Sequence, residues 1–185
     1  RRLGRMGPTL QGEHVVLTPS APEDTEEMWA ATESSLAELI PYMVWAEDAA
    51  PEHTRAFMEM AAHNWRDGVA NWIFTIRAEG SVAGTISLLA SKPMLKVAEV
   101  GYWLRSDLTG RGYMTEAVRA IVEWGFDQAG MERVELRASP ANIGSIRVAE
   151  KVGFIREGLL RGSGAAAGAR HDHYIYGLLK EEYER

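Results

Sequence analysis

Hydrophobic and polar residues alternate in several short stretches of this chain, a pattern typical of strands with one buried face. The alternation predicts strands over residues 14–18, 71–78, 82–91, 97–104, 133–138, 154–160 and 172–179. The short segment Glu79-Gly80-Ser81 separates the second and third of these strands. So short a connection predicts an antiparallel hairpin.

Apolar residues at helical spacing predict four helices, over residues 22–39, 51–67, 115–128 and 143–151. Pro51 suits a first helical turn, Gly68 is expected to end the second helix, and Thr115 is expected to cap the third. The buried face of the second helix is expected to carry Phe57, Met60, Ala61 and Trp65.

The order of these elements, without a separating linker, indicates one domain of mixed α/β class on a central sheet. We place that domain at residues 14–185. Residues 1–13 are expected to be an N-terminal arm or a remnant of expression. Residues 162–170, GSGAAAGAR, are rich in small side chains and are expected to form a mobile loop.

The junction between one strand and the helix after it carries the strongest chemical signal. Residues 99–116 read EVGYWLRSDLTGRGYMTE, an apolar strand followed by a turn that opens a helix. Gly110 and Gly112 lack Cβ atoms, so the backbone can come close to a bound group. The amides of residues 110–115 and the positive end of the helix then point at one small volume. This arrangement suits a phosphate or pyrophosphate.

Two common nucleotide motifs do not fit this turn. A triphosphatase loop requires a lysine after its second glycine, and none follows Gly112 at that place. A dinucleotide fingerprint requires a third glycine, where Thr115 stands, and a carboxylate ending the next strand, where Ala138 stands. A function that depends on ATP or NAD therefore loses support.

The turn resembles the pyrophosphate loop of the GNAT N-acetyltransferases. That loop follows the pattern Gln/Arg-x-x-Gly-x-Gly/Ala, and Thr109 to Met114 aligns with it, with both end positions departing from the pattern. The continuation Met-Thr-Glu-Ala, residues 114–117, is a common form in the RimJ/RimL branch of the family. A second block, residues 139–157, is similar to the family's N-x-x-S helix and the Gly-Phe strand after it. Its matching residues are Asn142, Ser145, Gly153 and Phe154.

The resemblance extends from about Val15 to Leu179 and implies a single GNAT-like domain. Such a domain has a central mixed, mostly antiparallel sheet flanked by helices. The resemblance also implies acetyl-coenzyme A as cosubstrate, a primary amine as acceptor, direct transfer through a ternary complex, a cytoplasmic location and a homodimer.

Composition is compatible with such an enzyme and argues against other classes. Hydrophobic residues make up 46% of the 185 residues, which is ample for a core, and no apolar run is long enough to span a membrane. Cysteine is absent, which removes disulfides and a covalent cysteine intermediate. A net charge of −6 argues against general nucleic-acid binding and suits a cationic amine acceptor.

Acetyl transfer requires a base for the attacking amine and an acid for the departing thiolate. We assign the base to Glu99, acting directly or through water, because alternation places it on one strand face with Gly101 and Trp103. Burial there would raise its pKa. The alternative is an exposed carboxylate paired with Lys96 or Arg105.

The acid is assigned from the second block. Asn142 and Ser145 lie one helical turn apart near a helix start. In the family, a hydroxyl at the position of Ser145 protonates the coenzyme A sulfur, and the side chain at the position of Asn142 orients pantetheine or a water. The alternative is that Asn142 only caps the helix while Ser145 faces solvent.

The resemblance places the cosubstrate against the strand end, the turn and the N-x-x-S helix. A backbone N–H near Trp103 or Leu104, where the strand splays from its neighbour, is expected to stabilise the oxyanion. The implied cofactor-binding residues are Trp103, Leu104, Gly110, Arg111, Gly112, Tyr113, Met114, Thr115, Asn142 and Ser145.

The acceptor is expected near Trp45, which lies in an aromatic segment, and near His171 or Asp172. Core packing or a dimer contact is the alternative for Trp45, whereas Trp65, Trp103 and Trp124 are expected in the core. No metal is expected, because His171 and His173 supply only half of a zinc site.

The favoured acceptor is the α-amine of a protein N-terminus, by the branch name that of a ribosomal protein. Deprotonating an α-amine at pH 7 costs about 1 kcal/mol, whereas a lysine costs roughly 4 to 5, so a modest base suits the N-terminus. The alternative within the same chemistry is a small amine, such as an antibiotic, a polyamine or an aminoacyl nucleotide. The alternative of another class is a non-catalytic module that binds coenzyme A.

Overall fold

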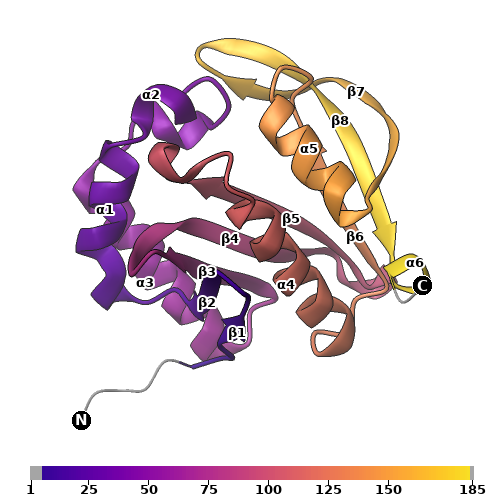
Figure 1. Cartoon of the computed structure of the whole chain (residues 1–185), viewed down its shortest axis with the longest axis horizontal. Coiled ribbons are helices and arrows are strands. Elements are labelled where there is room, and N and C mark those ends of the chain that lie inside the picture. Colours follow the sequence, from indigo (N-terminus) through magenta and orange to yellow (C-terminus); the bar gives the residue numbers. More distant parts are fainter. Residues whose placement is uncertain (1–5, 184–185) are drawn as a thin grey trace.

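Eight strands form one sheet in the computed structural model, which describes residues 6–183 (Figure 1). All neighbouring strands are antiparallel except β5 and β6, as expected for a mixed, mostly antiparallel sheet. In order across the sheet the strands are β1 (Leu10–Gln11), β2 (Val15–Pro19), β3 (Asn71–Ala78), β4 (Ser81–Lys92), β5 (Val97–Leu104), β6 (Arg133–Ala138), β8 (Ala169–Leu179) and β7 (Ile155–Ala166).

Helices cover both faces of the sheet (Figure 1). Helices α4 and α5 pack on one face, and α1 and α3 pack on the other. The α-helices are α1 (Thr25–Glu33), α2 (Leu36–Leu39), α3 (Pro51–Asp67), α4 (Tyr113–Asp127), α5 (Ile143–Val152) and α6 (Lys180–Tyr183). Short 3₁₀ turns are η1 (Pro22–Asp24), η2 (Val44–Ala46), η3 (Pro93–Leu95) and η4 (Ser106–Leu108).

The core consists of two clusters, one on each face. The larger lies under α4, where Val118 and Ile121 meet strand residues such as Phe74. The smaller joins α1 and α3 to the sheet through Met28, Met58 and Trp103. Trp65 and Trp124 pack against the larger cluster, with their ring centroids 6.0 Å apart, so the three tryptophans expected in the core do pack there.

Several predicted elements have the bounds that the sequence indicates, namely β3, β5, β6 and α3. Helix α3 starts at Pro51 and ends at Gly68, which has a left-handed φ of 69°. The predicted β3–β4 hairpin is also present. Its turn is tighter than expected, because Glu79 and Gly80 both have positive φ and Ser81 already pairs with Ala78.

The single helix predicted over residues 22–39 is wrong, since the segment forms η1, α1 and α2. The break lies at Ser34 and Ser35. Ser34 Oγ donates to the carbonyl of Ala31, and the buried Ser35 hydroxyl accepts a bond from the main-chain N–H of Ser106, 71 residues away. Such side-chain bonds compete with helical hydrogen bonds and end the helix here.

The predicted buried face of α3 is wrong in part. Phe57 and Met60 are 37% and 42% exposed, whereas Met58, Ala61 and Asn64 are buried. Apolar residues occupy neighbouring positions in this helix, so periodicity fixes their spacing without fixing which of them faces the sheet.

Thr115 does not cap α4, because the helix begins two residues earlier. Its N-cap is Gly112, whose φ of 84° is left-handed, and no side chain caps the first turn. Thr115 instead lies buried in the first turn of the helix. The amides of this turn therefore stay available to a ligand.

The mobile loop predicted at residues 162–170 is wrong, because most of this segment extends β7 and β8 into a long hairpin. Ala167 and Gly168 make its turn, both with positive φ. The small residues have a packing role: a Cβ atom on Gly164 would lie 2.0 Å from the ring of His173. Because Gly164 has no side chain, the ring of His173 can lie against β7 at this position.

The N-terminal arm is shorter than predicted. Leu10 and Gln11 pair with Leu17 and Val16 and so belong to the sheet, whereas residues 1–5 lie outside the described residues. Within residues 6–183, no helix is long and apolar enough to cross a membrane.

Candidate active site

Strands β5 and β6 separate halfway along their length, and the separation opens the sheet. Val97 to Val100 pair with Arg133 to Leu136, whereas β5 continues to Leu104 without a partner in β6. The pairing of β5 with β4 runs without a shift from Glu99 to Leu104, so no bulge causes the opening. One edge of residues 101–104 is thus free to bond a ligand, and the strand separates from its neighbour as the family resemblance implies.

The glycine-containing turn lies just beyond this opening. Gly110 and Gly112 have φ values of 77° and 84°, which favour glycine. A Cβ atom at either position would meet no protein atom within 4 Å, so the space in front of the turn is open. Because α4 starts at Tyr113, its uncapped amides and the positive end of its dipole face that space.

A cleft of about 640 Å³ joins the turn, the free edge of β5 and α5. Its walls include nine of the ten predicted cofactor-binding residues: Trp103, Leu104, Gly110, Gly112, Tyr113, Met114, Thr115, Asn142 and Ser145. Residues from the α2 region, namely Glu38, Leu39, Tyr42 and Met43, also line it.

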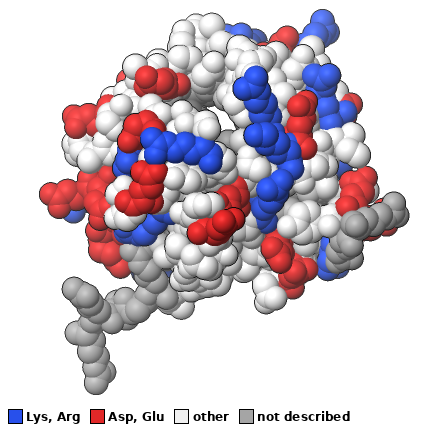
Figure 2. Space-filling model, in the orientation of Figure 1, with Lys and Arg blue, Asp and Glu red and all other residues white. Residues whose placement is uncertain are grey.

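Cations flank the cleft on the side of α5. Arg147 and Lys151, one helical turn apart, share its wall with Gly144 and Val148. Figure 2 shows Lys and Arg side chains running along α5 beside a hollow. No ion pair of Arg147 or Lys151 is found among residues 6–183, so both charges are available to an anion. This pair is absent from the residues that the sequence predicts for the site, although cations two and six positions after Ser145 form a helical stripe that signals it.

Arg111 is the predicted cofactor residue that the cleft does not include. Its guanidinium lies 2.6 Å from the carboxylate of Glu79, in the β3–β4 turn, and Tyr113 Oη donates to the same carboxylate at 2.6 Å. These bonds from Tyr113 and Arg111 lower the pKa of Glu79. The side chain of Arg111 thus anchors the turn, and its main chain is left to meet a ligand.

The predicted acid, Ser145, and its neighbour Asn142 both line the cleft. Asn142 Oδ1 accepts a bond of 3.1 Å from the main-chain N–H of Ser145, so Asn142 does cap α5. The hydroxyl of Ser145 does not simply face solvent, because it lies 2.7 Å from the hydroxyl of Tyr102. Tyr102 is absent from the residues that the sequence predicts for the site, and its side chain extends from β5 to contact α5.

Glu99 lies apart from this cleft, at the start of β5. It shares a strand face with Trp103, which packs toward α1 and α3, whereas Tyr102 faces α5. Burial raises the pKa of Glu99, and Arg137, at 3.5 Å from its carboxylate, partly opposes the rise. The alternative partners Lys96 and Arg105 pair instead with Glu132 and Asp107.

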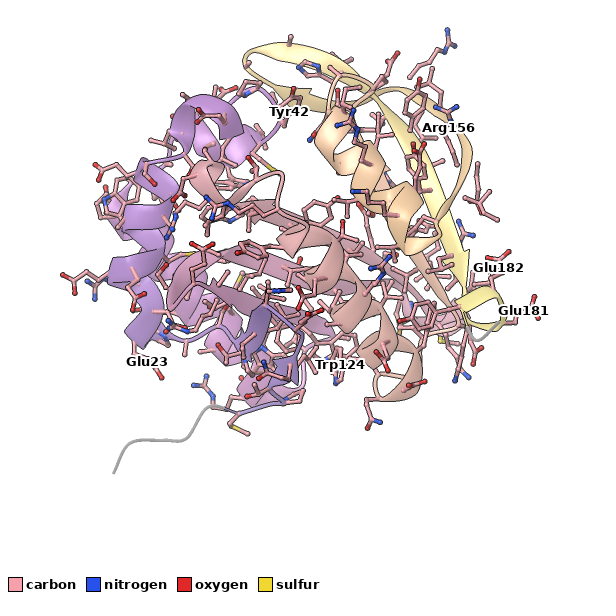
Figure 3. The ribbon with its side chains drawn as sticks, in the orientation of Figure 1. Glu23, Tyr42, Trp124, Arg156, Glu181 and Glu182 are labelled. Atoms are coloured by element: carbon pink, nitrogen blue, oxygen red, sulfur yellow. The ribbon has the colours of Figure 1, made fainter. Side chains whose placement is uncertain are left out.

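Two hydrogen bonds connect residues 42–47 to the segment before α5 and to the tip of the β7–β8 hairpin. Tyr42 Oη donates to the carbonyl of Ala141 at 3.4 Å, and the main-chain N–H of Gly168, at the tip of the β7–β8 hairpin, donates to Glu47 at 3.2 Å. Figure 3 places Tyr42 between α2 and that hairpin. Trp45, on the same segment, is 43% exposed and lies against Trp103 with ring centroids 5.9 Å apart.

The histidine segment of β8 contacts its own hairpin. His171 Nε2 lies 2.9 Å from the carbonyl of Ala166, and Asp172 accepts a bond of 2.7 Å from the N–H of Gly162. Neither contact reaches the cleft wall. Among residues 6–183 no three His, Asp or Glu side chains are grouped for a metal ion. Acceptor binding by His171 and Asp172 therefore stays a prediction.

Comparisons with known proteins agree with this geometry. The acetyltransferase (GNAT) domain family matches residues 14–155. The protein named "Putative ribosomal N-acetyltransferase YdaF" of Bacillus subtilis (strain 168) is 30% identical over 176 residues, covering 93% of this chain and 94% of that protein. The ribosomal-protein-serine acetyltransferase of Escherichia coli (strain K12) is 31% identical over 107 residues, covering 58% of this chain and 60% of that protein.

The solved structures include a coenzyme-bound neighbour. Mycobacterium smegmatis RimJ in complex with CoA-disulfide superposes with a TM-score of 0.85 at 25% sequence identity, covering 96% of this chain and 88% of that one.

Proposed function

This chain belongs to the GNAT acetyltransferase family and is an acetyl-coenzyme A-dependent N-acetyltransferase, and we propose that its acceptor is the α-amino group of a protein N-terminus, in particular of a ribosomal protein. One observation carries the proposal. The sheet opens between β5 and β6 into a cleft that joins the glycine-containing turn to Arg147 and Lys151, and the half-buried carboxylate of Glu99 lies outside the wall of that cleft, on the strand face opposite Tyr102. An acyl donor in the cleft and an amine approaching from the side of Glu99 can therefore meet at this opening.

The cleft fits coenzyme A by its chemistry. We propose that the amides of residues 110–115 hold the pyrophosphate and that Arg147 and Lys151 face the remaining phosphate. The pantetheine arm then runs along the free edge of β5 toward Trp103 and Leu104. A main-chain N–H on that edge would stabilise the oxyanion of the tetrahedral intermediate.

The two proposed catalytic groups act on opposite sides of the reacting carbon. Glu99 takes a proton from the amine through water, because its carboxylate lies outside the cleft that holds the donor. Ser145 gives its hydroxyl proton to the departing sulfur, since its hydroxyl faces the cleft at the end of β5. We further propose that Trp45, His171 and Asp172 line the route of the acceptor.

The acceptor is tested by measuring coenzyme A thiol release across a panel. The panel contains peptides with free Ser or Ala N-termini, the same peptides blocked at the N-terminus but carrying lysine, polyamines, and aminoglycosides. Turnover confined to free N-termini supports the proposal. Turnover confined to small amines supports the alternative acceptor, and silence with coenzyme A binding intact supports a non-catalytic module.

The cation pair makes a prediction about affinity. The double variant Arg147→Ala/Lys151→Ala is expected to bind acetyl-coenzyme A roughly 10-fold more weakly, because two charge-assisted contacts to phosphate are lost. The difference in affinity between the double variant and the wild type should shrink as the salt concentration is raised from about 50 to about 500 mM, since salt screens exposed charges. Isothermal titration calorimetry measures both effects.

Arg156→Ala provides the control for that loss of charge. Arg156 lies on β7 with its guanidinium 4.4 Å from the ring centroid of Tyr174 and is outside the cleft wall (Figure 3). Its removal should leave the affinity unchanged. Equal affinity of the double variant and the wild type would contradict the phosphate assignment.

Glu99 makes a prediction about pH. Burial raises its pKa above 4.5, and a base works only when deprotonated, so kcat/KM should rise with pH through that raised pKa. The variant Glu99→Gln should lose about 100-fold in kcat/KM and lose this acidic limb. A pH profile that Glu99→Gln leaves intact would exclude Glu99 as the base.

Stability separates this role from a structural one. A raised pKa means that the fold favours the neutral carboxyl, so the contribution of Glu99 to stability is full below pH 4.5 and is lost as pH rises through its folded pKa. Glutamine is neutral at every pH. Glu99→Gln should therefore keep or raise the melting temperature at pH 7, because the partly exposed pair with Arg137 contributes little.

We also propose that residues 14–185 form one domain together with the β1 strand, and that the protein acts as a cytoplasmic homodimer. The family resemblance supports the dimer. Light scattering coupled to gel filtration tests it, and a monomer at micromolar concentration would contradict it.

A further inference from the structure

Tyr102 and Ser145 meet across the cleft from two separate elements, β5 and α5. Their hydroxyl oxygens are 2.7 Å apart, although the residues are 43 positions apart in the chain. Both residues line the cleft. Asn142 fixes the main chain of Ser145, and within residues 6–183 neither hydroxyl has another hydrogen-bond partner. The pair is therefore free to point one proton into the cleft.

We propose that Tyr102 and Ser145 form a proton relay that ends at the sulfur of coenzyme A. This inference rests on the proposed function and on the place of Ser145 in it. Tyr102 Oη donates to Ser145 Oγ, which leaves the proton of Ser145 directed at the sulfur. Tyr102 is thus a positioning residue for the acid and also its source of protons.

The relay balances in atoms and charge. The thioester C–S bond breaks with its electron pair going to sulfur, and the amine nitrogen forms the new bond to carbon. Ser145 gives its proton to sulfur and takes that of Tyr102, and solvent in the cleft returns one to Tyr102. The proton that leaves the amine goes to the opposite face through Glu99. One proton is released and one is taken up in each turnover.

The chemistry of the two hydroxyls favours this order. An aliphatic alcohol is a far weaker acid than a phenol, so serine alone delivers a proton poorly. Burial raises the pKa of Tyr102 to about 12, and the bond to Ser145 opposes the rise. Tyr102 therefore keeps its proton at neutral pH while remaining the stronger acid of the pair.

A purely structural role for Tyr102 makes different predictions, because its ring also packs against the larger core cluster. Tyr102→Phe keeps the ring and removes the hydroxyl. For a relay, kcat should fall about 10-fold while the KM for acetyl-coenzyme A stays within twofold. The double variant Tyr102→Phe/Ser145→Ala should be no slower than Ser145→Ala, since residues that act as a unit are non-additive.

The matched control is Tyr174→Phe, because Tyr174 lies on β8 beneath Arg156, outside the cleft wall. It should keep the wild-type kcat. Tyr102→Phe with unchanged kcat, or a double variant whose losses multiply, would overturn the relay.

A second readout needs no acceptor. The thiol of bound coenzyme A is titrated by thiolate absorbance against bound desulfo-coenzyme A. A donor aimed at sulfur stabilises the thiolate, so its acid ionisation constant should be at least threefold larger in the wild type than in Tyr102→Phe. Equal acid ionisation constants of the bound thiol in the wild type and in Tyr102→Phe would overturn the relay. Wild-type silence with every acceptor would instead contradict the proposed function, and the titration would still decide the relay.

Discussion

Gly84→Ala is expected to cause the largest loss of stability among single substitutions near the site, roughly 3 kcal/mol or more. Gly84 has a φ of 151°, and a Cβ atom there would lie 2.1 Å from the carbonyl oxygen of Trp103. The clashing atoms belong to the backbone of β5, which cannot rotate away. The strand that borders the cleft must move or unfold. Chemical denaturation should show the loss, and the melting temperature should fall by about 6 to 12 °C.

Gly80→Ala is the matched control in the same hairpin. Gly80 also has a positive φ, of 77°, but a Cβ atom there meets no atom within 4 Å. Its loss should be about 1 kcal/mol, from backbone strain alone. Equal losses at the two glycines would show that β4 and β5 tolerate the clash. Gly84→Ala should also weaken coenzyme binding in the fraction of the protein that stays folded, because Gly84 pairs with Leu104, which lies in the cleft wall.

Ser145→Ala is expected to cause the largest loss of rate, about 100-fold or more in kcat with acetyl-coenzyme A. The hydroxyl faces the cleft beside the free edge of β5 and has Tyr102 as its hydrogen-bond partner. Alanine removes the proton donor and leaves the cap intact, because Asn142 bonds the main chain of residue 145. Steady-state kinetics should therefore show an unchanged KM for acetyl-coenzyme A. Thermal denaturation should show an unchanged melting temperature.

Ser91→Ala controls for the loss of a hydroxyl elsewhere. Ser91 lies near the far end of β4, where its hydroxyl is 3.5 Å from the carbonyl of Val97, outside the cleft wall. It should keep full activity. A Ser145→Ala variant that also kept full activity would remove the acid from the mechanism. A loss confined to KM would make Ser145 a binding residue.

Local patterns account for the elements that the sequence predicts correctly. Alternation fixes β3, β5 and β6, and turn chemistry fixes the Glu79-Gly80 hairpin and the Gly68 end of α3, because each signal arises within a few neighbouring residues. The same holds for the glycine-containing turn before α4, where Gly110 and Gly112 adopt left-handed conformations. Family motifs then identify the donor, since they lie in these same short segments.

The wrong predictions share a different cause. Residues 162–170 resemble a loop locally, and only pairing between β7 and β8 makes them strands. Ser35 ends a helix because it bonds Ser106 from another part of the chain. Two adjacent stripes of apolar residues run along α3, and packing against the rest of the protein decides which of them is buried and which is exposed. Each depends on partners that are distant in sequence.

The sequence by itself thus determined the class of fold, the glycine-containing turn and the acetyl donor, because these reside in periodicity and short motifs. Tertiary structure decided where β5 separates from β6, namely after Val100. It also placed Tyr102 against Ser145 and aligned Arg147 and Lys151 with the cleft. Such juxtapositions follow from how the sheet and helices pack, and packing joins residues whose separation along the chain leaves no local signal.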